Sequence, residues 1–159
     1  MKSLYLIRHA KAMPSTPMMT DRDRPLDEHG ERDAKKLGKR LHHDKLHVDL
    51  MISSPARRAL ATARIIAHKL VQDENTIVID DRIYASDVDT LMRIIGETNP
   101  EVDSLMIFGH NPEFSMLAQR LCEEIDSMPT CALARFRFDV DSWSDITGAT
   151  PVDAYLEAP

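Results

Sequence analysis

Three short apolar stretches of the chain each end at a cationic or ionisable residue, and a helix-like pattern follows each of them. Apolar runs of this length, bounded by turn residues, predict buried strands. The stretches are residues 4–7 before Arg8 and His9, residues 50–53 before Arg57 and Arg58, and residues 104–108 before His110. Because ligands bind outside the carboxyl ends of the strands in an open α/β sheet, we expect the side chains that follow these strands to meet in one crevice. The four that would line it, a set that favours an anion, are Arg8, His9, Arg58 and His110.

Apolar residues at helical spacing predict four helices. Three of them follow the strands named above, and the other follows a further strand over 76–79. Ser54 before Pro55 is typical of a helix N-terminus with Ser54 as the cap, and Ser86 with Asp89 has the spacing of a capping box. Asn99-Pro100 is expected to end the third helix. The four helices and their buried faces are 27–41 with Ala34, Leu37 and Leu41; 55–70 with Ala59, Ala63, Ile66 and Leu70; a helix from 86 with Leu91, Ile94 and Ile95; and a helix from 112 with Phe114, Leu117 and Leu121.

The remaining segments complete an alternation of strands and helices. Residues 76–79 predict a strand, residues 132–140 alternate as a half-buried strand with one wet face, and residues 154–156 indicate a short terminal strand. Residues 11–25 contain three prolines and predict a loop over the end of the first strand. This order predicts an α/β fold, a three-layer sandwich with a mostly parallel central sheet and helices on both faces. A length of 159 residues favours a single domain, 1–159.

Composition and charge narrow the functional classes. A net charge of −6 argues against a partner made of nucleic acid, which requires a basic face. No apolar run approaches the roughly 18 residues of a membrane span, and the chain enters its first strand without a signal-peptide pattern, so we expect a cytoplasmic protein with no membrane partner. Cys122 and Cys131 do not form a metal-binding spacing and are interpreted as small hydrophobic residues. No exposed apolar stripe stands out, which favours a monomer.

Four short blocks together resemble a known family. Arg8-His9-Ala10 resembles the Arg-His-Gly signature of the histidine phosphatase (phosphoglycerate-mutase-like) superfamily, residues 54–63 are similar to its Ser-Pro-x-x-Arg-Ala-x-x-Thr-Ala block, and residues 109–112 resemble its second-histidine motif. Arg24-Pro25-Leu26 and Gly30 look most like the SixA-type phosphohistidine phosphatases. Each block alone is a weak signal, but their order and spacing together are specific. Ala10 departs from the usual glycine, which indicates that the backbone there does not need a glycine-specific conformation.

The resemblance implies roles that the chemistry of the residues supports. His9 would be the nucleophile, while Arg8, Arg58 and His110 would hold the phosphoryl group. A transferring phosphoryl group spreads negative charge over its oxygens, which two guanidinium groups and an imidazole can bind. Neighbouring Arg charges would keep His9 neutral and nucleophilic. We therefore expect a phosphohistidine intermediate later hydrolysed by water, with no cofactor and no metal site.

The sequence does not determine which residue would protonate the leaving group. Larger relatives carry a carboxylate general acid after the third strand, whereas this chain offers no clear match, and the candidates are Asp23, Asp87 and Tyr84. Asp23 is also a candidate for substrate binding. An imidazole leaving group needs less assistance than an alkoxide, which favours protein phosphohistidine as the substrate. The alternatives are a phosphomonoesterase or mutase acting on a small phosphorylated molecule, and a non-catalytic module that recognises phosphate.

Overall fold

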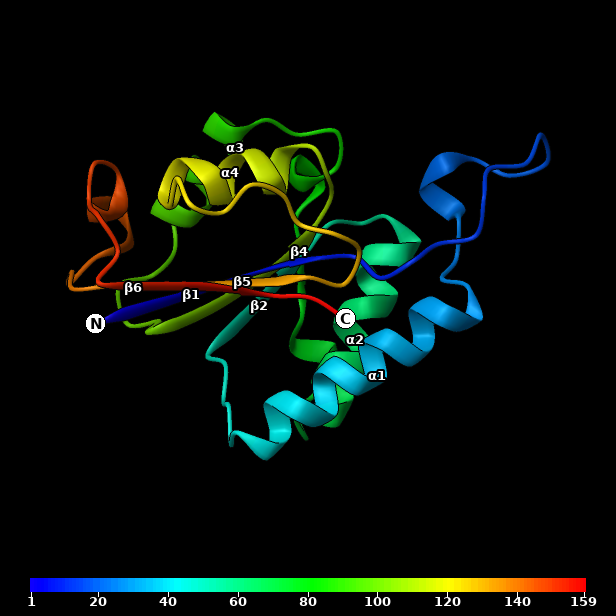
Figure 1. The fold of residues 1–159 in the computed structure, drawn as a ribbon, viewed down its shortest axis with the longest axis horizontal. Coiled ribbons are helices and arrows are strands. Elements are labelled where there is room, and N and C mark those ends of the chain that lie inside the picture. Colours follow the sequence, from blue (N-terminus) through cyan, green and yellow to red (C-terminus); the bar gives the residue numbers. More distant parts are fainter.

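The six strands of the chain form one sheet, and the four α-helices pack against it (Figure 1). The computed structural model describes residues 1–159. The strand order is β3-β2-β4-β1-β5-β6, in which β3, β2, β4 and β1 pair in parallel and β5 and β6 pair antiparallel. The strands are β1 Lys2–Arg8, β2 Leu50–Ser53, β3 Val78–Ile79, β4 Ser104–Gly109, β5 Leu133–Phe138 and β6 Asp153–Glu157. The helices are α1 Glu28–His43, α2 Arg57–Lys69, α3 Val88–Gly96 and α4 Glu113–Leu121.

Helices cover the two faces of the sheet in pairs. Figure 1 shows α1 and α2 on one side of the sheet and α3 and α4 on the other. Successive residues of a strand point to opposite faces, so Leu4 and Leu6 of β1 enter the core under α3 and α4, whereas Tyr5 and Ile7 enter the core under α1 and α2. The predicted three-layer α/β fold with a mostly parallel sheet is therefore confirmed. None of the helices has the length and apolar character that crossing a membrane requires.

The central strands form where the apolar runs predicted them, and the predicted helix faces are buried apart from Leu121, which is half-buried against the core. The predicted buried face of the first helix is buried in α1, which Asp27 caps through the Gly30 N–H at 2.7 Å. The loop over 11–25 is irregular apart from a 3₁₀ turn at Asp21–Asp23 and one bridge between Ala12 and Leu26. The terminal strand exists as β6.

Several predicted boundaries are wrong. Helix α2 begins at Arg57 rather than at Pro55, and Ser54 does not cap it, because its hydroxyl lies against His110 instead. Helix α3 is capped by Asp87, whose carboxylate accepts from the Thr90 N–H at 2.7 Å, rather than by Ser86, and it ends at Gly96, before Asn99-Pro100. The strand predicted over 76–79 is reduced to Val78–Ile79, because Thr76 belongs to a 3₁₀ turn.

The end of β4 is packed too closely to accept a side chain. A Cβ added to Gly109 would lie 2.4 Å from Cε1 of Phe114 and 2.9 Å from Cγ2 of Ile83, and both of those side chains are buried. The absence of a side chain at Gly109 thus lets α4 approach the strand that leads directly to His110.

Replacement of this glycine should therefore destabilise the fold. We expect Gly109→Ala to lower the free energy of unfolding by about 1–3 kcal/mol, since an overpacked core must shift to accept the methyl group. Urea unfolding would measure the change. Gly96→Ala is the matched control, because its Cβ would meet only the Cα of Ser144 at 3.8 Å, and its stability should stay within about 1 kcal/mol of wild type. Equal stability of Gly109→Ala and wild type would contradict the packing argument.

Candidate active site

The carboxyl ends of three neighbouring parallel strands bring four of the predicted side chains together. Arg8 is the last residue of β1, and the next residue, His9, donates its N–H to the carbonyl of Gly109 at 3.0 Å. His110 directly follows β4, and its ring centroid lies 5.2 Å from that of His9. Arg58, in the first turn of α2 beyond β2, is close enough for its charge to act on both imidazoles. The four side chains that the order of the elements predicted to meet therefore lie at one edge of the sheet.

One hydrogen bond sets the orientation of the His9 ring. Nδ1 of His9 lies 2.7 Å from the carbonyl oxygen of Ala10. A carbonyl oxygen can only accept, so Nδ1 carries the proton and donates it. In the neutral ring the lone pair is then on Nε2. Ala10 is itself fixed, because its N–H donates to the Thr62 hydroxyl at 3.0 Å. Its φ is not positive, which is consistent with an alanine where a glycine is usual.

Burial keeps both imidazoles uncharged. It is the main cause that lowers the pKa of His9 to about 4, and the charges of Arg58 and Arg8 lower it further, against the opposing effect of the Ala10 carbonyl. Burial also lowers the pKa of His110 to about 3, assisted by His9 and Arg58. At neutral pH the Nε2 lone pair of His9 is therefore free to attack an electrophile.

The two arginines are anchored by main-chain carbonyls and keep donors to spare. Arg8 donates from Nη1 to the carbonyl of Met128 at 3.1 Å. Arg58 donates from Nη1 to the carbonyl of Asp21 at 2.7 Å and from Nη2 to its carboxylate at 3.1 Å. A guanidinium has five N–H donors, and the Nε of each arginine has no partner within the protein. Two forks of this kind match the geometry of a phosphoryl group.

Asp21 ties the loop over 11–25 to the cluster, and sequence reasoning missed it. Its carboxylate binds Arg58, accepts from Nε of Arg24 at 3.1 Å and accepts from the Tyr84 hydroxyl at 2.6 Å. The Tyr84 bond is the largest cause that lowers the pKa of Asp21 to about 2, and the Arg58 and Arg24 bonds add to it. The only sequence signal was the alternation of Asp and Arg over 21–24, which does not distinguish Asp21 from Asp23.

The three candidates for a general acid are placed very differently. Tyr84 lies at the cluster, with its ring edge-on to His110 at a centroid distance of 5.7 Å. Asp87 instead caps α3. Asp23 accepts from the Thr20 hydroxyl at 2.9 Å and faces a surface depression that Arg57 and Arg64 also line, so the structure does not bring it to the other predicted site residues. A carboxyl that the sequence did not single out, Glu113 at the start of α4, has a pKa raised by burial.

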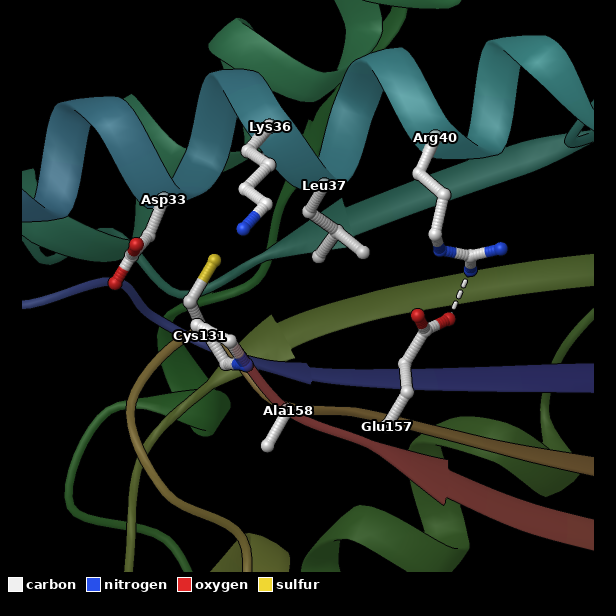
Figure 2. A pocket seen from close by; sticks show the side chains of 8 residues that line it. Asp33, Lys36, Leu37, Arg40, Cys131, Glu157 and Ala158 are labelled. Carbon is white, nitrogen blue, oxygen red and sulfur yellow. Dashed lines mark hydrogen bonds and ion pairs between the residues drawn. The ribbon is translucent and has the colours of Figure 1, made fainter.

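A separate cavity of about 160 Å³ lies between α1 and the end of β6 (Figure 2). Figure 2 shows Leu37 and the Cys131 thiol facing it, with Arg40 and Glu157 paired at its rim. Burial raises the pKa of Cys131 to about 12, so the thiol is protonated at neutral pH. None of the four clustered residues lines this cavity. Neither this cavity nor any other part of the chain has three or more His, Cys, Asp or Glu side chains placed to hold a metal ion.

Comparison with known proteins agrees with the geometry. The family model of the histidine phosphatase superfamily (branch 1) matches residues 4–93 of the chain. The chain belongs to this superfamily. The match covers Arg8, His9 and Arg58, and His110 lies beyond it.

Individual relatives place it among the SixA-type members. An uncharacterised protein of Mycobacterium tuberculosis is 30% identical over 152 residues, which cover 88% of this chain and 91% of the relative. A structure assigned as phosphohistidine phosphatase SixA from Agrobacterium tumefaciens is 26% identical, with a TM-score of 0.83 over 99% of this chain and 98% of the other. The structure of the protein histidine phosphatase SixA with tungstate is 20% identical and shares the fold, with a TM-score of 0.79 over 98% and 94% of the two chains. The likeness to the Agrobacterium tumefaciens structure supports a SixA-type histidine phosphatase.

The neutral state of the two buried histidines should make stability depend on pH. Above pH 6.5 the two rings are neutral in both folded and unfolded chains, whereas between pH 6.5 and about 4 only the unfolded chain takes up protons on them. Stability is therefore lost as the pH falls through this window. We expect the two rings to account for about 2–4 kcal/mol of lost unfolding free energy between pH 7 and pH 5.

Urea unfolding of wild type and of the double variant His9→Gln, His110→Gln at pH 7, 6 and 5 would isolate this contribution. The variant keeps the five other histidines and all carboxyl groups. Between pH 7 and pH 5 it should therefore lose about 2–4 kcal/mol less unfolding free energy than wild type loses. An identical loss in both proteins would mean that the two rings are not held neutral by the fold.

Proposed function

We propose that this phosphatase removes the phosphoryl group from phosphohistidine on a protein and that His9 carries it as a covalent intermediate. The observation that carries the proposal is the bond from His9 Nδ1–H to the Ala10 carbonyl, because it leaves the Nε2 lone pair of a neutral ring beside two guanidinium groups. Tungstate, bound by the SixA structure that shares this fold, is a tetrahedral oxyanion like phosphate.

The chemistry takes two steps. Nε2 of His9 attacks phosphorus, the P–N bond to the substrate imidazole breaks, and the bonding electron pair leaves with that imidazole. Water then attacks phosphorus, the P–N bond to His9 breaks with its electron pair returning to Nε2, and the protons of the water leave with the inorganic phosphate. Arg8, Arg58 and the imidazole of His110 would bind the phosphoryl oxygens, where negative charge is spread in the transition state.

The state of Asp21 supports phosphohistidine as the substrate. Asp21 is the carboxylate bound to the cluster, and its pKa of about 2 means that it carries no proton to give to a leaving group at neutral pH. A phosphohistidine protonated on its other ring nitrogen leaves as neutral imidazole and needs no donated proton. An alkoxide leaving group would need one.

The surroundings of the cluster fit a substrate presented by a protein. Arg22 and Asp81 near its mouth have side chains that are 52% and 82% exposed. Arg22 lies over the ring of Tyr84, at 5.8 Å from the centroid, and that ring lies 5.7 Å from the ring of His110. A side chain that projects from another protein could reach the cluster past these residues.

We also propose that the protein acts in the cytoplasm as a monomer. Both cysteines are free thiols, as expected in a reducing compartment. The exposed large hydrophobic side chains are scattered over separate elements, such as Met18 in the first loop, Met116 on α4 and Val152 before β6, rather than gathered in one patch.

One observation favours a second candidate, a phosphomonoesterase or mutase that acts on a small molecule. Glu113 lies three residues beyond His110, and burial raises the pKa of its carboxyl group. A carboxyl group with a raised pKa could retain the proton that an alkoxide leaving group needs. In that case phosphate esters would be the better substrates.

Parallel phosphate-release assays would distinguish these functions. With EDTA present, we expect wild type to release phosphate from a phosphohistidine-bearing protein faster than from a phosphate ester, and we expect His9→Ala to release about 10³-fold less or none, because the nucleophile is lost. Arg57→Ala is the matched control, since Arg57 is the exposed neighbour of Arg58.

Each alternative outcome has a clear meaning. Faster release from the ester would favour the second candidate, and transfer of phosphate within a metabolite without net release would indicate a mutase. Phosphate binding without release from either substrate would indicate a non-catalytic recognition module. Retained turnover in His9→Ala would exclude His9 as the nucleophile.

A further inference from the structure

Ser54 is fixed beside the second histidine of the cluster. It follows β2, is completely buried, and donates its N–H to the carbonyl of Phe108 in β4 at 3.0 Å. Its Oγ lies 2.7 Å from Nε2 of His110 and accepts from the N–H of Ala56 at 3.2 Å. The hydroxyl is thus held between a main-chain donor and one nitrogen of the imidazole.

The hydrogen-bonding capacity of the hydroxyl decides which group donates. A serine hydroxyl has one proton and two lone pairs, and the Ala56 N–H occupies one lone pair. His110 Nε2 is the remaining partner of Oγ, so the hydroxyl proton is satisfied only if it points at Nε2. If Nε2–H donated instead, the buried hydroxyl proton would have no acceptor, a loss comparable to an unmade hydrogen bond. Nε2 therefore accepts.

The other nitrogen of the ring must then carry the proton. His110 is neutral in the folded protein and has one N–H to place. Since Nε2 accepts from Ser54, the proton lies on Nδ1, which is buried and has no partner within the protein. The neutral ring in this tautomer offers a donor, whereas the opposite tautomer would present a lone pair to an anion and repel it.

We propose that Ser54 is a positioning residue that holds His110 in the Nδ1–H tautomer, so that the imidazole donates to the phosphoryl group while remaining neutral. The phosphoryl contact of His110 rests on the proposed function, but the tautomer does not. The two rings then play opposite parts. The Ala10 carbonyl accepts the Nδ1 proton of His9 and leaves the Nε2 lone pair free. The Ser54 hydroxyl donates to the Nε2 lone pair of His110 and leaves the Nδ1–H free.

The tautomer can be measured directly in the wild-type protein. Long-range ¹H–¹⁵N correlation spectra at neutral pH distinguish a protonated from an unprotonated ring nitrogen, and comparison with His110→Gln assigns the signals of His110. We expect a protonated Nδ1 and an unprotonated Nε2. An Nε2–H tautomer would overturn the inference, whether or not the protein proves to be a phosphohistidine phosphatase. This readout needs no Ser54 variant.

The role of Ser54 can be tested with a matched pair of variants. In Ser54→Ala, Nε2 loses its donor, so we expect the His110 signals to move toward the Nε2–H tautomer. We also expect kcat for phosphate release to fall about 10- to 100-fold, less than the roughly 10²–10³-fold cost of deleting a transition-state donor outright. Ser53→Ala is the control, because Ser53 is equally buried and its hydroxyl donates to the Ser54 carbonyl at 2.9 Å without touching His110.

The control should retain the wild-type tautomer and a kcat within about 3-fold of wild type, since it removes no contact to His110. A Ser54→Ala protein with an unchanged tautomer would overturn the positioning role. Equal losses of kcat in the two variants, with no change in the His110 signals, would assign Ser54 a purely structural part and would also overturn it.

Discussion

The structure depends on keeping two imidazoles uncharged next to two permanent cations. His9 and His110 are buried at the ends of adjacent strands with their rings 5.2 Å apart, and Arg8 and Arg58 lie beside them. A protonated ring at this place would be a buried positive charge close to two other cations. Burial, together with these neighbouring charges, therefore lowers the pKa of both histidines well below its usual value. The cationic charge of the site thus stays on the arginines, and the histidines remain available as a nucleophile and as a hydrogen-bond donor.

Burial meets this constraint, and main-chain and buried hydroxyl groups, rather than further charged residues, decide where the remaining proton of each ring lies. The carbonyl of Ala10 and the hydroxyl of Ser54 each contact one ring nitrogen, and both belong to segments that leave the sheet next to the cluster. On the outer side, Asp21 joins Arg58 to Tyr84 and so attaches the first loop to the segment that follows β3. Polar groups at the strand ends set the proton positions, while a loop carboxylate balances one of the cations.

The parts of this arrangement that follow local rules could be predicted from the sequence. Apolar runs located β1, β2 and β4, and because parallel strands share one carboxyl edge, the convergence of Arg8, His9, Arg58 and His110 followed from the order of the elements. The length of β3 was overestimated, because Thr76 belongs to a 3₁₀ turn that the hydrophobic pattern does not indicate.

The parts that depend on tertiary contacts could not be predicted. A serine before a proline is typical of a helix cap, but the hydroxyl of Ser54 has only two lone pairs and one proton, and an imidazole distant in sequence engages it. Asp21 and Asp23 differ by two positions in an irregular loop. Which of them faces Arg58 depends on how that loop folds back, and this leaves no trace in the pattern of residues.

The central claim is that phosphate passes through His9, and the most direct test is to identify where the phosphoryl group is covalently bound during turnover. Wild-type protein would be mixed with a phosphohistidine-bearing protein, quenched in alkali at successive short times, and its peptides analysed by mass spectrometry. We expect a transient phosphoryl group on His9 that forms before free phosphate appears and decays as phosphate accumulates. A phosphoryl group on any other residue, or phosphate release with no adduct at any quench time, would contradict it.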